Sequence, residues 1–117
     1  MTQEDKELLM KDLCSRLPYG IKLETLEGPQ ELNIKWLSIN MCNIANPYLP
    51  YLFPLSSMTE WQERELEVLM KNSIESCGML SPYDCLEMER FFNENHLDWR
   101  GLIPKGLAKD ATGLNIY

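Results

Sequence analysis

Apolar residues recur at helical spacing in the first segment of the chain. Leu9 and Leu13 are four residues apart, which places them on one face of an α-helix. Thr2 precedes this stripe and Asp5 follows three residues later, an arrangement typical of a capping box. Because proline interrupts helical hydrogen bonding, Pro18 ends the segment. The pattern predicts an N-terminal helix whose solvent side carries Glu4, Asp5, Lys11 and Asp12.

Alternation of apolar and polar residues then replaces the helical spacing. It predicts one strand over Tyr19–Leu26, a turn at Glu27–Pro29 and a second strand over Glu31–Asn40. The alternation changes phase between Trp36 and Leu37. A β-bulge and a break into two short strands both explain this change, and the pattern does not choose between them.

Three prolines mark the next segment, Cys42–Pro54, as an extended connector. Its aromatic and leucine side chains are too apolar for a free linker, so we expect it to pack along the domain.

Two further helices follow the connector. Thr59 and Gln62 predict a capping box at the start of the first. One broad face of this helix would carry Trp61, Glu65, Val68 and Leu69. We expect a loop over Lys71–Leu80. The second helix would begin at Ser81, with Pro82 in its first turn, and end at Asn95 or His96.

The order of these elements predicts an α+β fold with a small antiparallel sheet of short strands. The length fits one domain over residues 1–117. After the last helix, a C-terminal segment that includes Trp99 and Leu102 would dock on the domain, and Ala108–Tyr117 would form a loose tail.

The net charge of the chain limits the kinds of partner that we expect it to bind. The formal net charge is −7, and the Lys and Arg residues form no cluster. This disfavours nucleic acid and anionic membranes as partners, and it permits a basic protein partner. The chain has no apolar run of membrane-spanning length, and its acidic N-terminus does not resemble a secretory signal, so we expect a cytoplasmic location. The oligomeric state is not predicted.

The metal- and redox-active residues form no recognisable motif. No two of the four cysteines have C-x-x-C spacing, and His96 is the only histidine. We expect buried, reduced thiols, with Cys14 and Cys85 on apolar helix faces, although a Cys77–Cys85 disulfide is geometrically conceivable. His96 is expected at a helix end or on the surface. No metal or cofactor is predicted.

Two groups of aromatic residues are candidates for an interface. An Arg beside an aromatic residue is a frequent interface anchor, but we favour a structural interpretation, in which Trp99 fills the core and Arg100 pairs with a local acid such as Glu94 or Asp98. The connector aromatics have the same two interpretations, since an exposed cluster suits protein binding and a covered one is core. The possible interface residues are Tyr48, Tyr51, Phe53, Trp99 and Arg100.

Three segments together resemble a family of small uncharacterised proteins of gut bacteria and their phages and prophages. They are LLMKDLCSRLPYGIK at Leu8–Lys22, PYLPYLFPLSSMTEWQ at Pro47–Gln62 and NENHLDWRGLIPKGLA at Asn93–Ala108. The chain departs from the family pattern at Phe53, where the family usually has Arg. The resemblance implies a cytoplasmic protein of mobile-element origin, and it implies no catalytic residue, cofactor or substrate.

These observations favour a small, acidic, non-enzymatic protein-interaction or regulatory module. A first alternative is an enzyme or small-ligand binder, which requires its candidate groups to converge in one pocket. A second is a phage counter-defence protein that mimics nucleic-acid charge, which requires a contiguous acidic stripe. The candidate groups of the first alternative are His96, Asp98, Arg100, Lys105 and a cysteine.

Overall fold

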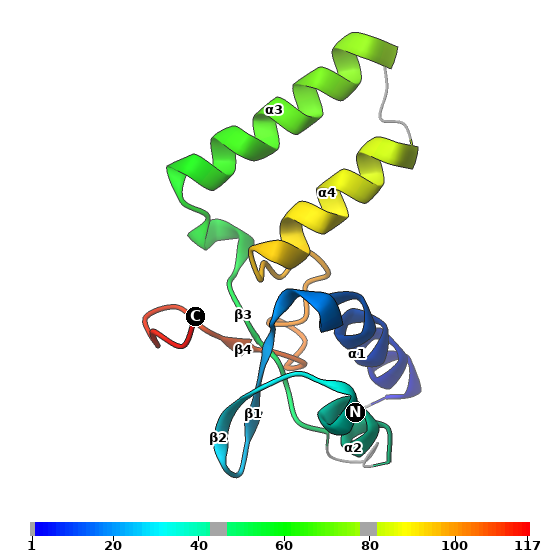
Figure 1. The fold of residues 1–117 in the computed structure, drawn as a ribbon, viewed down its shortest axis with the longest axis vertical. Coiled ribbons are helices and arrows are strands. Elements are labelled where there is room, and N and C mark those ends of the chain that lie inside the picture. The colour runs from blue at the N-terminus through cyan, green and yellow to red at the C-terminus, as the bar shows by residue number, and fades with distance from the viewer. Residues whose placement is uncertain (1, 43–46, 78–81) are drawn as a thin grey trace.

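The fold consists of a compact body and a projecting helical arm (Figure 1). The computed structural model describes residues 2–42, 47–77 and 82–117, without the side chains of residues 72–77 and 82–84. The arm is formed by α3 (Glu60–Cys77) and α4 (Pro82–Glu94), and all other elements belong to the body. The molecule measures 47 × 30 × 24 Å along its principal axes. The α+β class is confirmed.

Helix α1 (Gln3–Arg16) supplies the central apolar face of the body. Its predicted capping box is confirmed, because the Asp5 amide donates to Thr2 Oγ1 at 3.1 Å and the Thr2 amide donates to Asp5 Oδ2 at 3.3 Å. Leu9 and Leu13 are fully buried, and each such leucine contributes on the order of 2 kcal/mol to folding. The surrounding core consists of Ile21, Leu23, Leu32, Leu52, Leu102, Leu107 and Ala108.

A β-hairpin follows a short 3₁₀ turn over Leu17–Tyr19. Strands β1 (Lys22–Thr25) and β2 (Gly28–Glu31) pair antiparallel, so the antiparallel sheet is confirmed. The turn lies at residues 26–27, earlier than predicted. Gly28 opens β2 with a φ of 92°, a conformation that favours glycine.

The predicted strand over Glu31–Asn40 is wrong beyond Glu31. Residues Ile34–Cys42 form helix α2, and Asn33 caps it by accepting the Trp36 amide at 3.0 Å. The change of phase at Trp36 is therefore explained by the spacing of apolar residues in a helix, and it is neither a β-bulge nor a break between two strands. Asn40, which is buried, exchanges two hydrogen bonds with the backbone of Tyr48, at 2.8 and 2.9 Å, and so ties α2 to the connector.

The connector crosses the centre of the body, as expected. Strand β3 (Tyr51–Leu52) pairs in parallel with β4 (Lys109–Asp110). Just before β3, Pro50 forms an antiparallel bridge to Leu23 in the hairpin, and just after it, Phe53 forms a parallel bridge to Leu97. A 3₁₀ turn at Leu55–Ser57 then leads into the arm.

The prediction of a loose tail at Ala108–Tyr117 is wrong. Besides the β3–β4 pairing, the Tyr117 hydroxyl accepts a hydrogen bond from the Lys22 amide and donates one to the Tyr51 carbonyl, at 2.8 and 2.7 Å. Tyr117 also stacks on His96. The sequence shows little apolar periodicity here, because backbone pairing and one aromatic residue hold the segment.

Helices α3 and α4 pack against each other in the arm. The predicted cap of α3 is confirmed, since Thr59 Oγ1 accepts the Gln62 amide at 3.2 Å and Gln62 Oε1 accepts the Thr59 amide at 3.0 Å. The predicted loop is wrong over Lys71–Cys77, which continues α3 because no proline or glycine interrupts it. Pro82 begins α4 and Glu94 ends it, close to prediction, whereas the cap proposed at Ser81 lies outside the described residues.

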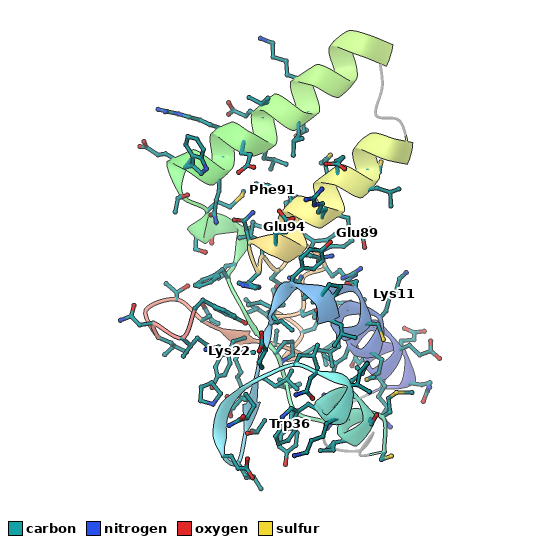
Figure 2. The ribbon with its side chains drawn as sticks, in the orientation of Figure 1. Lys11, Lys22, Trp36, Glu89, Phe91 and Glu94 are labelled. Atoms are coloured by element: carbon teal, nitrogen blue, oxygen red, sulfur yellow. The ribbon has the colours of Figure 1, made fainter. Side chains whose placement is uncertain are left out.

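A buried ion-pair network joins α1 to the C-terminal segment. Asp12, predicted on the solvent side, is fully buried; its carboxylate accepts from Arg16 Nε at 2.9 Å and from Arg100 Nη1 at 2.7 Å. Arg16 is also fully buried and donates to the Leu97 carbonyl at 2.7 Å. Figure 2 shows Glu89, a further partner of Arg100, on the part of α4 nearest the body.

Replacing Asp12 tests this network. We expect Asp12→Asn to lower the free energy of unfolding by about 3–5 kcal/mol, because two guanidinium groups lose their shared buried counter-ion. Urea denaturation measures the change. Glu4→Gln, at an exposed position of the same helix, is the control and should change it by less than about 0.5 kcal/mol. A loss below about 1 kcal/mol for Asp12→Asn would contradict the assigned role.

The cap of α3 gives a second stability test. Thr59→Ala should cost about 1 kcal/mol, because the Gln62 amide loses its acceptor. Ser56→Ala, on an exposed neighbouring hydroxyl, should leave the urea midpoint unchanged. Equal effects of the two substitutions would show that the cap does not limit the stability of the arm.

Candidate functional site

The connector aromatics predicted as interface residues are half-buried and have partners within the chain. The Tyr48 ring packs edge-on against Trp36, with ring centroids 5.7 Å apart. Tyr51 Oη donates to Glu24 at 3.4 Å, and Phe53 packs against Tyr117 with centroids 5.7 Å apart. Burial, followed by the charge of Glu24, raises the pKa of Tyr51. These contacts support the interpretation of the connector as part of the domain's packing.

Trp99 and Arg100 also have partners within the chain. Trp99 stacks on Phe92 with centroids 6.0 Å apart, and its Nε1 donates to Asn93. The Arg100 guanidinium lies 4.1 Å from the Trp99 ring centroid, and its side chain is only 8% exposed. The predicted ion-pair partners of Arg100, Glu94 and Asp98, are wrong: Arg100 pairs with Asp12, far away in sequence, and with Glu89.

The groups that a catalytic or small-ligand site would require lie in different environments. Asp98 is buried and accepts from the backbone amides of Leu102 and Ile103 at 2.7 and 2.9 Å. Arg100 belongs to the buried network, and Lys105 is exposed on a turn. Four hollows formed by described residues contain none of His96, Asp98, Arg100 and Lys105 in their linings, and Cys14 lines one of these hollows without any of those groups.

His96 lies in the turn just after α4, two residues beyond Glu94, which agrees with the expected helix-end position, and it is more enclosed than the sequence suggests. Its ring stacks on Tyr117 with centroids 4.1 Å apart. Among the described residues, its buried Nδ1 has no hydrogen-bond partner. Burial, and secondarily the positive charge of Arg16, lower the pKa of His96 from 6.5 to about 4. Burial likewise raises the pKa of Tyr117 to about 12. His96 is therefore neutral at physiological pH and packs as an aromatic ring.

The cysteines do not follow the sequence expectation. Cys14 and Cys85 are free and exposed, so the prediction of buried thiols is wrong for both, because each lies on a helix face away from the core. Cys42 is exposed as well. The possible partner of Cys85, Cys77, has a side chain outside the described residues. Within the described ranges, no three His, Cys, Asp or Glu side chains are arranged to hold a metal ion.

The outer face of α3 exposes two large apolar side chains. Trp61 is 74% exposed and Val68 is 56% exposed. Together with Arg64 and Glu65 they line a hollow of about 300 Å³. We call these four residues the α3 face. A tryptophan that keeps most of its surface in water loses the hydrophobic benefit of burial, and tryptophan is a residue type enriched at binding hot spots.

Sequence reasoning located these residues but assigned them to the wrong environment. It placed Trp61 and Val68 on the core side with Leu69. Among the α3 side chains that the structure describes, Gln62, Leu66 and Leu69 are half-buried, and Gln62 reaches Asn95 at the base of the arm. The α3 face lies about a third of a turn away from them, since successive residues turn by about 100°. The sequence did contain a signal for this arrangement: Trp61 and Val68 form a second line of apolar residues, beside the line that packs within the arm.

The arm carries nearly all of the molecule's net negative charge. Helices α3 and α4 contain nine Asp and Glu residues against three Lys and Arg residues, a formal charge of −6 out of −7. The acidic residues Glu60, Glu63 and Glu67 are exposed along α3. The two apolar side chains of the α3 face, Trp61 and Val68, therefore lie among mostly acidic residues.

No protein-family model, curated protein or solved structure matches the chain. The family resemblance of the three sequence segments therefore stays a prediction. No helix of the described residues is both long and apolar enough to cross a membrane.

The environment of His96 predicts a pH dependence of stability. The folded protein binds the His96 proton less tightly than the unfolded chain does, so the unfolding free energy should fall as pH decreases from about 6.5 towards 4. His96→Asn removes this titration, and asparagine tolerates the φ of 56° at this position. We expect a shallower decrease for the variant in urea midpoints across this range. Parallel pH profiles would contradict the assignment.

Proposed function

We propose that this chain is a small, acidic, non-enzymatic protein-interaction or regulatory module that binds a protein partner through the α3 face. The observation that carries the proposal is the exposure of Trp61 beside Val68 on a helix that projects from the body (Figure 1). The five interface residues predicted from the sequence contact other residues of the chain, so they expose less surface to a partner than Trp61 does.

The arm is well placed for such contact. Its base is held by the Gln62–Asn95 hydrogen bond at 3.1 Å and by the pairing of Glu89 with Arg100. The α3 face lies about a third of a turn around α3 from Gln62. A partner can therefore cover it without displacing the packing of the body.

The two alternative functions are less well supported. The groups of the catalytic alternative are engaged separately, as described above. For mimicry of nucleic-acid charge, the stripe of Glu60, Glu63 and Glu67 would have to be uninterrupted, yet Arg64 is one helical turn from Glu60 and is exposed. A cytoplasmic protein of mobile-element origin is part of our proposal and rests on the three-segment resemblance alone.

Affinity purification with matched variants tests the proposed surface. Wild-type protein should retain a partner from cell lysate in near-stoichiometric amount, and Trp61→Ala should reduce that amount at least about tenfold, because hot-spot truncations cost more than 1 kcal/mol. Leu26→Ala is the control, since Leu26 is 94% exposed at the hairpin turn of the body. Trp61→Ala should keep the wild-type urea midpoint, as expected for an exposed residue. A partner retained equally by Trp61→Ala, or none retained by wild type, would reject the proposal.

A further inference from the structure

We infer that the partner of the α3 face is a basic amphipathic helix, which inserts one apolar side chain between Trp61 and Val68 and places Lys or Arg residues beside the arm. This inference rests on the proposed function and specifies the chemistry of the partner. Two independent observations support it, namely the arrangement of the four residues and the distribution of charge.

The four residues have the spacing of a helix-packing site. Trp61, Arg64, Glu65 and Val68 occupy positions i, i+3, i+4 and i+7 and together line the hollow. When two helices pack with interlocking side chains, one side chain of the first enters a hole formed by four residues of the second at this spacing. The hollow therefore has the layout that accepts a side chain from a facing helix.

Charge selects the type of helix. The arm carries a formal charge of −6, and Glu60 and Glu67 are exposed on one flank of the α3 face. Residues on such flanks decide which helices pair, because opposite charges attract and like charges repel across the contact. Basic residues on the incoming helix would meet these glutamates.

A second copy of this chain fits less well. In an antiparallel pair of α3 helices related by a two-fold axis, equivalent flanks meet, so Glu60 of one copy would lie near Glu67 of the other. In a parallel pair the same flank would face Glu65, which is also acidic. Arg64 on this flank would offset part of that repulsion, but the acidic residues outnumber it, so self-association through this face brings together flanks of net negative charge.

Two designed peptides of about 20 residues test the inference. They share one apolar stripe of leucine and alanine, and one carries only lysine on its flanks while the other carries only glutamate. Calorimetric titration should give micromolar binding of the lysine peptide and at least about tenfold weaker binding of the glutamate peptide. Trp61→Ala should weaken the lysine peptide at least about tenfold, whereas Leu86→Ala, an exposed residue of α4, should leave its binding unchanged. Sedimentation equilibrium of the protein alone should show a monomer.

The opposite results overturn the inference. Absence of lysine-peptide binding, equal binding of both peptides, or equal binding by Trp61→Ala would each reject a basic helix on this face. A dimer abolished by Trp61→Ala would assign the face to a second copy. If the lysine peptide fails while Trp61→Ala still loses a partner from lysate, the inference fails and the proposed function stands.

Discussion

The buried carboxylate of Asp12, held between Arg16 and Arg100, is the contact on which the rest of the structure depends. Arg16 and Asp12 come from one turn of α1, whereas Arg100 comes from the segment after α4. Arg16 also holds the Leu97 carbonyl, and Leu97 bridges to Phe53 in the connector. Burying these charges is costly unless they are paired, so the network strongly disfavours arrangements in which α1, the connector and the base of the arm separate.

This anchoring leaves the two parts of the molecule with different roles. The body has one core around α1, with exposed apolar side chains such as Leu26 and Ile34 outside it, and its formal charges nearly balance. The arm is held at its base by the Gln62–Asn95 hydrogen bond, carries most of the net negative charge and keeps Trp61 in water. An apolar surface at a distance from the core, in a strong field of one sign, has little value for folding. It is useful for recognition, and this contrast is why we place the interaction surface on α3.

Local signals in the sequence predicted local structure well. The capping boxes at Thr2 and Thr59 depend on residues three positions apart, and both are present. Helix α2 was missed because its apolar residues fit an alternating pattern, although Asn33 offered a cap. The burial of Asp12 depends on Arg100, and periodicity contains no information about a contact between residues 88 positions apart. The exposure of Trp61 was missed for a similar reason, since helical spacing identifies a face without saying whether another element covers it.

Native-state hydrogen exchange tests the central claim that one buried network unites the body. The amides of Leu13 in α1 and of Leu97 and Leu102 in the C-terminal segment should exchange with one common free energy, equal to that of global unfolding. The amide of Val68 in the arm should exchange through a smaller opening. Exchange of Leu97 and Leu102 at a clearly lower free energy than Leu13 would show that the C-terminal segment detaches independently, and it would contradict the account.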